Sequence, residues 1–316
     1  MITVLAGGVG AARFLRGLVL VEDPHRVRVI VNVGDDVERH GLHVSPDLDS
    51  ITYWLARVIH PEQQWGRADE TYVVAGELER FGEDRWFSLG DRDLATHIYR
   101  TKRLHEGAPL SSVTAEVAAA FGLEVTLLPA TDDPVETRVS TADGRDLHFQ
   151  EYWVGERAAP EVTAVRLHGA EAARPAPGVV EAIADADAII LAPSNPVVSI
   201  GTILAVPGIR EALHRATAPI LGVSPIVGGS VVRGMADRLL PAVGADVSAD
   251  GVARHYGDLL DGWVIDDTDR EQARGLERTG LAVRTTNTIM DEVEAAADLA
   301  KVCLDLAADL AQTDPA

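Results

Sequence analysis

Residues 2–21 have the sequence ITVLAGGVGAARFLRGLVLV, and this stretch predicts the fold of the chain. The first five residues are typical of a buried strand, and the glycines that follow predict a tight turn. The remaining residues carry apolar side chains at helical spacing. A strand, a glycine turn and a helix in this order open an α/β fold, in which strands alternate with helices.

A mostly helical region interrupts this alternation after a second strand over 27–36, which ends in two carboxylates. The interruption extends from residue 45 to about residue 150. Its predicted elements are helices over 47–59, 91–107 and 110–122, a strand over 123–133, and a hairpin over 135–154 around Ala142, Asp143 and Gly144.

From about residue 161 the alternation returns. Short, fully apolar segments bounded by turn residues are typical of parallel strands that are covered on both faces. We predict strands over 186–192, 218–224, 261–267 and 281–287, and a terminal helix over 291–312. The pattern predicts an α/β, doubly wound, mainly parallel sheet built from residues 1–44 and 151–316, with residues 45–150 forming an inserted, mostly helical lobe.

The composition excludes several classes of protein. The net charge of −21 argues against a nucleic-acid-binding protein, which presents a basic face. No apolar run is long enough for a membrane span, and the N-terminus lacks the basic segment of a signal peptide. A single cysteine, Cys303, excludes an internal disulfide framework and a cysteine-built metal site. We therefore expect a cytoplasmic protein.

Three strand ends carry loops rich in Gly, Ser, Asn and Pro, namely GGVG (7–10), PSNP (193–196) and SPIVGG (224–229). At the carboxyl edge of a parallel sheet these loops would lie where open α/β sheets bind ligands. Their backbone N–H groups, with the start of the following helix, favour phosphate. Each loop alone is also compatible with a structural turn, but the three together predict a nucleotide or diphosphate site.

The first glycine loop departs from two known phosphate-binding sequences. It lacks the Lys-Ser/Thr pair of a P-loop, and Arg13 stands where the dinucleotide fingerprint has its third Gly or Ala. The helix dipole disfavours a positive residue in the first turn, so Arg13 indicates an anion nearby. The missing glycine, together with Asn32 where an acid would bind a ribose, argues against an NAD-dependent oxidoreductase.

Two pairs of carboxylates follow the second strand. Asp35 and Asp36 stand at the strand end, and Asp47 and Asp49 enter the next helix in the segment SPDLDS. Helix capping is the structural explanation of the second pair. The functional explanation is a Mg²⁺ site, because this ion prefers carboxylate oxygens and would offset the charge of a diphosphate. One carboxylate could also orient or deprotonate an incoming hydroxyl.

The segment LGDRDLATH places Asp91, Arg92, Asp93 and His97 around one helix start. Asp93 and His97 are four residues apart and share a face of the helix. A capped, salt-bridged helix is the structural explanation of this segment. Nearby aromatic residues either belong to the core or line a slot for a planar ring, and they are Tyr53, Trp65, Trp86 and Phe87.

Nine segments, in this order, resemble the 2-phospho-L-lactate transferase family (CofD, called FbiA in actinobacteria), which works in the biosynthesis of the deazaflavin coenzyme F-420. They extend from residue 2 to about residue 240. The segments are GGVGAARFLRGL, VNVGDD, GLHVSPDLDS, WFSLGDRDLATHIYRT, LPATDDPVETRV, HFQEYWVG, APSNPVVSIGTILAVPGIREAL, SPIVGG and VRGMAD.

The resemblance implies a Rossmann-like fold with a helical lobe on the acceptor side. It implies that the terminal ribityl hydroxyl of the deazaflavin Fo attacks a guanosine diphosphate-linked donor, taking up a phosphoenolpyruvyl or 2-phospho-L-lactyl group while GMP leaves. Mg²⁺ as cofactor and a homodimer are implied as well. LPATDD and VRGMAD resemble the actinobacterial branch, which implies an enolpyruvyl donor and a dehydro product. Thr202, where many archaeal members have proline, could lie close to the donor.

The resemblance also implies roles for individual residues. The nucleotide would contact Gly7, Gly8, Gly10, Arg13, Asn32, Ser194, Asn195, Pro196 and Ser224. Fo would contact Asp49 and Arg92, with His97 as a neighbour. The catalytic candidates are Asp47, Asp49 and Arg92, and the metal candidates are Asp35, Asp36 and Asp47.

Two other functions remain open on the sequence. A non-catalytic sugar-nucleotide-binding regulator, as in the distantly related gluconeogenesis-factor family, would share the glycine loop and the fold type. A nucleotide-sugar glycosyltransferase would use DLD (47–49) as a metal motif. A regulator has no need of SPDLDS, LGDRDLATH and HFQEYWV as an acceptor slot, so these segments favour the transferase.

Overall fold

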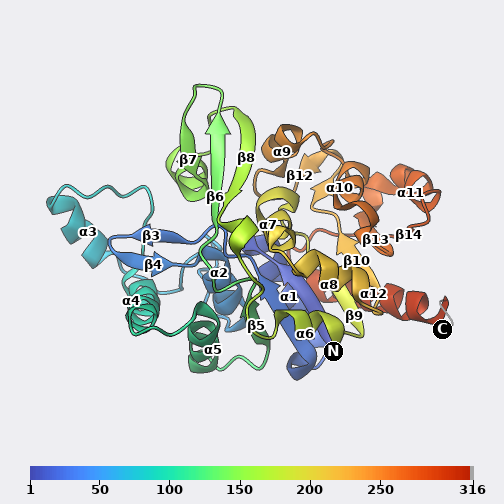
Figure 1. The fold of residues 1–316 in the computed structure, drawn as a ribbon, viewed down its shortest axis with the longest axis horizontal. Helices are drawn as coiled ribbons and strands as arrows, with labels where there is room; N and C mark the ends of the chain where they lie inside the picture. Colours follow the sequence, from blue (N-terminus) through green and yellow to red (C-terminus); the bar gives the residue numbers. More distant parts are fainter. Residues whose placement is uncertain (314–316) are drawn as a thin grey trace.

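The computed structural model describes residues 1–313 and has a seven-stranded parallel sheet at its centre (Figure 1). The strand order is β14-β13-β10-β9-β1-β2-β5. The strands are β1 (Ile2–Ala6), β2 (Val27–Val31), β5 (Thr126–Pro129), β9 (Ala188–Leu191), β10 (Ile220–Val223), β13 (Gly262–Asp266) and β14 (Ala282–Thr286). The predicted doubly wound, mainly parallel α/β sheet is confirmed.

Helices cover both faces of this sheet, which explains why its central strands are apolar throughout. Val4 and Leu5 are both fully buried, and they belong to hydrophobic cores on opposite faces. One core is formed with α1 (Gly8–Val21), α2 (Pro46–Leu55), α5 (Leu110–Ala120) and α12 (Val293–Thr313). The other is formed with α6 (Val179–Ala184), α7 (Gly201–Ala205), α8 (Ile209–Arg215), α9 (Ala236–Leu239), α10 (Ala249–Tyr256) and α11 (Arg270–Glu277).

The winding of the sheet reverses between β1 and β9, which pair in parallel. From β1 the chain proceeds outward to β2 and β5, and from β9 it proceeds to β10, β13 and β14 in the opposite direction. The loops that leave β1 and β9 therefore separate at the carboxyl edge and leave a crevice there. This is the position at which doubly wound sheets bind ligands.

Smaller elements surround this crevice (Figure 1). A three-stranded antiparallel sheet has the order β7-β6-β8, and two short hairpins join β3 to β4 and β11 to β12. The bounds of these elements and of the remaining helices are β3 (Val37–Arg39), β4 (Leu42–Val44), α3 (Val73–Arg80), α4 (Asp91–His105), β6 (Glu136–Thr141), β7 (Asp146–His148), β8 (Val162–His168), β11 (Ile226–Val227) and β12 (Ser230–Val231).

Two features differ from the predicted boundaries. The predicted lobe, residues 45–150, contains β5, which pairs with β2 and is an edge strand of the central sheet. The predicted hairpin strand that ends at residue 154 stops at β7, and a π-helical turn over Glu151–Gly155 follows. β8 instead supplies the third strand against β6, so a segment outside the predicted lobe completes this small sheet.

Within residues 1–313 no single helix is long and apolar enough to cross a membrane. One pair, Pro196–Ala205 and Ile209–Arg215, meets the length and composition requirement together but is bent by 83°.

The contact between α1 and α12 depends on Gly17. A Cβ atom on this residue would lie 2.2 Å from the backbone carbonyl carbon of Ala296. Gly17→Ala should therefore lower the free energy of unfolding by about 1–3 kcal/mol, because the backbone of α12 has to move. Urea denaturation measures this change.

The matched control is Gly76→Ala, in α3, where nothing lies within 4 Å of an added Cβ. There the substitution should be neutral or stabilising by up to about 1 kcal/mol, because alanine is the better helix former. Equal effects at the two positions would contradict the proposed close packing of α1 on α12.

Candidate functional site

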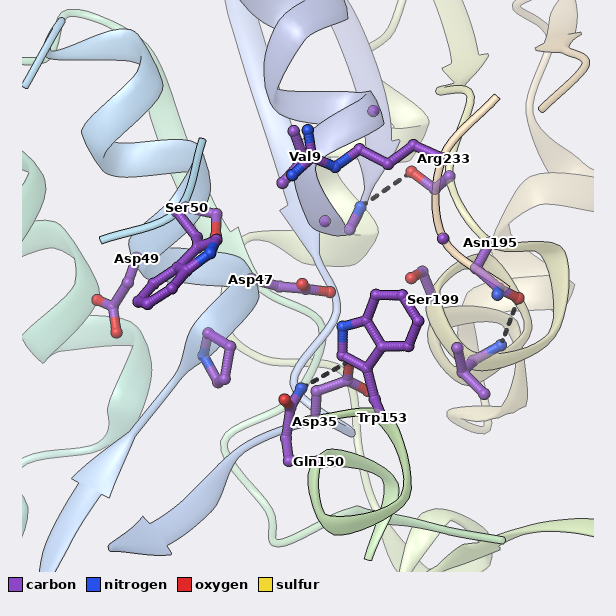
Figure 2. A pocket seen from close by; sticks show the side chains of 18 of the residues that line it. Val9, Asp35, Asp47, Asp49, Ser50, Gln150, Trp153, Asn195, Ser199 and Arg233 are labelled. Atoms are coloured by element: carbon purple, nitrogen blue, oxygen red, sulfur yellow. Dashed lines mark hydrogen bonds between the residues drawn. The ribbon is translucent and has the colours of Figure 1, made fainter. Parts of the chain in front are cut away.

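A cavity of about 600 Å³ occupies the crevice at the carboxyl ends of β1 and β9 (Figure 2). It is lined by the first glycine loop, by the loop after β9, by α2 and by aromatic residues of the peripheral elements. The sequence-predicted residues in its lining are Gly7, Gly8, Gly10, Arg13, Asp35, Asp47, Asp49, His97, Ser194, Asn195 and Ser224. Residues up to 217 positions apart in sequence are thus brought to one cavity.

The glycine loop is held against the loop after β9 by close backbone contact. A Cβ atom on Gly10 would lie 2.3 Å from the carbonyl oxygen of Pro193, and Gly8 has a φ of +70°. The N–H group of Gly7 donates to Ser194 Oγ at 3.1 Å. Only glycine permits this approach, which presents the first N–H groups of α1 to the cavity.

The other two loops use their polar side chains internally. Asn195 Oδ1 accepts hydrogen bonds from the N–H groups of Val197 (2.9 Å) and Val198 (3.3 Å), so it caps the π-helical turn that follows. Ser224 Oγ donates to the carbonyl of Ile226 at 2.9 Å. Pro196 is buried and lies outside the cavity lining. These side chains make the loops rigid, and the loops then expose backbone groups.

Asp35 and Asp47 form a buried acidic pair, with 4% and 6% of their surfaces exposed. Figure 2 shows the Asp47 carboxylate pointing toward the middle of the cavity, with Asp35 nearby. Burial, opposed by hydrogen bonds from Asn32 and the Gly8 N–H, raises the pKa of Asp47 to about 6. Burial and the charge of Asp47 also raise the pKa of Asp35 well above its ordinary value.

Asn32 positions Asp47 and does not line the cavity. Its Nδ2 donates to Asp47 Oδ2 at 2.9 Å, and its Oδ1 accepts from the Gly34 N–H at 2.9 Å. The predicted contact of Asn32 with a nucleotide is therefore not part of this arrangement. The side chain is fully buried and acts through the carboxylate that it holds.

The acidic pair fits a divalent cation. Asp35 Oδ1 is buried without a hydrogen-bond partner, which is costly for a carboxylate unless it is protonated or binds a cation. Within residues 1–313 no group of three or more His, Cys, Asp or Glu side chains could hold a metal by itself. Mg²⁺ is typically bound by one or two carboxylates with phosphate and water as its other ligands, so two carboxylates are sufficient.

Asp36, the third metal candidate, has other partners. Its Oδ2 accepts a hydrogen bond from Ser45 Oγ at 2.7 Å and lies 2.9 Å from His43 Nε2. It lies outside the cavity lining. These contacts connect the β3–β4 hairpin to the start of α2, while Asp36 Oδ1, like Asp35 Oδ1, is buried without a hydrogen-bond partner.

Asp49 belongs to a buried charge network that the sequence did not reveal. Both of its oxygens accept hydrogen bonds from the guanidinium of Arg100, which is 2% exposed. His97 lies between two carboxylates, with its Nδ1 3.7 Å from Asp49 Oδ2 and its Nε2 3.2 Å from Asp93 Oδ1. Tyr53 donates to Asp93 Oδ1 at 2.6 Å and so connects α2 to α4.

Arg92 does not reach this network. Its side chain is exposed and lies outside the cavity lining, while its backbone N–H donates to Glu70 Oε2 at 2.7 Å. Asp93, His97 and Arg100 recur at helical spacing along one face of α4, and that spacing is the signal that would have selected Arg100 instead.

Aromatic side chains form the wall on the peripheral side of the cavity. Tyr53, Trp65, Trp86 and Phe87 all line it, and the rings of Trp86 and Phe87 meet edge to face at 5.7 Å. Trp153 also lines the cavity, and Figure 2 shows its ring between Asp47 and Ser199, although the sequence placed it on a strand. The π-helical turn projects its ring into the cavity, and Trp153 is 39% exposed.

Thr202 is a core residue. It is 1% exposed, lies outside the cavity lining and donates to the carbonyl of Val198 at 2.9 Å. The expected position of Thr202 close to a donor is therefore not found in this structure.

Because the pKa of Asp47 is raised, the effect of Asp47→Asn on the free energy of unfolding should depend on pH. Because the folded protein holds this proton more tightly than the unfolded chain, the wild type loses stability as the pH rises from about 4 through about 6. The variant avoids this loss, so at pH 8 it should be more stable by up to about 3 kcal/mol, since one pKa unit equals about 1.4 kcal/mol.

Denaturation at pH 4 and pH 8 tests this expectation, because the difference should vanish at pH 4. The control is Asp298→Asn, on the exposed face of α12, which should show no such pH dependence. An Asp47→Asn variant that is no more stable than the wild type at pH 8 would contradict the burial cost of this carboxylate.

Comparisons with known proteins identify the family of this chain. The family model of 2-phospho-L-lactate transferase CofD matches residues 2–303. The phosphoenolpyruvate transferase of Kitasatospora aureofaciens is 51% identical over 312 residues, which cover 97% of each chain. That of Streptomyces griseus subsp. griseus is 52% identical over 314 residues, which cover 98% of this chain and 99% of the relative. The crystal structure of a UPF0052-family protein from Bacillus halodurans shares the fold, with a TM-score of 0.63, 17% identity and coverage of 96% and 98% of the two chains. The chain belongs to the 2-phospho-L-lactate transferase CofD family.

Proposed function

We propose that this transferase of coenzyme F-420 biosynthesis moves a phosphoenolpyruvyl group from a guanosine diphosphate-linked donor to the terminal ribityl hydroxyl of Fo. GMP would leave, and dehydro coenzyme F-420-0 would form. With a 2-phospho-L-lactyl donor the product would be coenzyme F-420-0. The observation that carries the proposal is one cavity that combines a phosphate-binding loop, a buried acidic pair and an aromatic wall. The names of the relatives at about half identity support the enolpyruvyl donor.

The donor would bind where β1 and β9 diverge. The N–H groups that follow Gly8 in the first turn of α1 and the adjacent positive side chain of Arg13 suit a diphosphate. The rigid loops at Ser194 and Ser224 line the same part of the cavity. The nucleoside would therefore lie over the half of the sheet formed by β9 and β10.

Asp35 and Asp47 would hold Mg²⁺. When bound, this ion would neutralise negative charge on the phosphates. Asn32 keeps Asp47 aimed at the cavity. Phosphoryl transfer depends mainly on positioning and charge neutralisation, and the chain needs no covalent nucleophile for it.

Asp49 would orient the acceptor hydroxyl and accept its proton. Arg100 holds the Asp49 carboxylate in place by hydrogen bonding. Asp49 is one of the residues that line the cavity. The ribityl oxygen would form a bond to the donor phosphorus that carries the enolpyruvyl group. The bond from that phosphorus to the GMP oxygen breaks, and GMP leaves with the electron pair.

The deazaflavin ring would lie against the aromatic wall formed by Trp65, Trp86, Phe87 and Trp153. These rings offer a planar ligand the stacking surfaces that it needs. A homodimer in the cytoplasm completes the proposal, as the family resemblance implies.

The decisive experiment incubates the purified protein with Fo, Mg²⁺ and either the enolpyruvyl or the lactyl guanosine diphosphate donor, and follows the deazaflavin product by mass spectrometry. We expect product with both donors, faster with the enolpyruvyl donor, and none after EDTA is added. Nucleotide binding without product from either donor would contradict the transferase and favour the sugar-nucleotide-binding regulator.

Trp153→Ala tests the acceptor side of the cavity. The substitution should raise the KM for Fo by about 5- to 100-fold, the range for loss of one stacking contact, while the KM for the donor stays unchanged. The control is Phe81→Ala, because Phe81 is 84% exposed and lies outside the cavity lining. A larger effect on the donor than on Fo would overturn the placement of the ring.

A further inference from the structure

Two guanidinium groups line the same cavity as the acidic pair. Arg13 is in α1 and is half-buried, and Arg233 is in the segment after β12 and is exposed. Figure 2 shows Arg233 extending from its segment toward the first turn of α1, above the carboxylate of Asp47.

Among residues 1–313 neither arginine is in a salt bridge, although the chain carries 49 acidic residues and the Asp291 carboxylate partly offsets the lowering of the Arg13 pKa by burial. Arg100, for example, is paired with Asp49. Arg13 donates to the carbonyl of Met290 at 3.3 Å. Arg233 donates to Gln64 Oε1 and, at 3.3 Å, to the carbonyl of Gln63. All of these acceptors are neutral.

The two positive charges are close enough to act on each other. Arg233 is exposed as a residue, but removal of part of its guanidinium from water, followed by the charge of Arg13, lowers its pKa. Like charges at one site repel, and an anion placed between them removes this repulsion. The first N–H groups of α1 face the same space and favour the same kind of ligand.

We propose that Arg13 and Arg233 form a two-arginine subsite that binds phosphate oxygens of a nucleoside diphosphate. Arg233 is the added binding residue, and its planar guanidinium suits two phosphate oxygens at once. Asp47 lies against the glycine loop at the start of α1, so positive side chains beside it offset the repulsion between this carboxylate and a phosphate. The inference rests on the proposed function, because it extends the donor site.

A purely structural role for Arg233 makes a different prediction. Gln63 and Gln64 belong to the segment that precedes Trp65, so Arg233 also connects the β11–β12 segment to the aromatic side of the cavity. If this connection were the only role of Arg233, removal of Gln64 would have the same effect as removal of Arg233. If Arg233 binds phosphate, Gln64→Ala retains the positive charge and most of the affinity.

Isothermal titration calorimetry with GDP and with guanosine tests the subsite without any need for transfer activity. Arg233→Ala should weaken GDP binding by about 10- to 100-fold, the cost of losing hydrogen bonds to a charged group, and Arg233→Lys should weaken it less. Guanosine affinity should not change. Gln64→Ala should stay within about twofold of the wild type, as should Arg238→Ala, an exposed arginine of α9 outside the cavity.

The inference is overturned if Arg233→Ala binds GDP within about twofold of the wild type, or if Gln64→Ala loses as much affinity as Arg233→Ala. A wild-type protein that binds no GDP would overturn the subsite and the donor site together. A wild-type protein that binds GDP but transfers nothing to Fo would remove the proposed function, and the variant affinities would still decide the subsite.

Discussion

The contact between the glycine loop and the loop after β9 is the constraint on which the site depends. A side chain on Gly10 would collide with the Pro193 carbonyl, and a Cβ on Gly7 would lie 2.6 Å from Asp47 Oδ2. Because both glycines lack side chains, the start of α1, the β9 loop and the acidic pair share one small volume. The charge pattern of the cavity follows from this close approach.

Acidic and basic side chains that line one cavity define how a diphosphate could bind. Asp35 and Asp47 are buried together at a cost that a bound cation removes. Arg13 and Arg233 line the same cavity, and neither is in a salt bridge among residues 1–313. A ligand that carries both phosphate and a divalent cation complements the acidic pair and the two arginines at once. Phosphate alone or the cation alone would complement only one of these two groups.

The peripheral elements supply the acceptor side through buried polar contacts. Asp49, Arg100, His97 and Asp93 connect α2 to α4, and Tyr53 donates to the same Asp93 oxygen that His97 approaches. Removing one partner of such a network leaves a buried charge unpaired, so the network fixes the relative position of the two helices. The aromatic wall lies on this fixed support, which gives a planar acceptor a defined location.

The sequence by itself determined the elements and the class of site. Local periodicity separates strands from helices, and glycine-rich strand ends predict phosphate loops, because both depend on residues that are near one another in the chain. The tertiary structure alone decided that β9 lies beside β1, that Arg100 rather than Arg92 is buried, and that Trp153 and Arg233 face the cavity. These outcomes depend on packing between distant segments, and on burial for the pKa of Asp47, so no local pattern contains them.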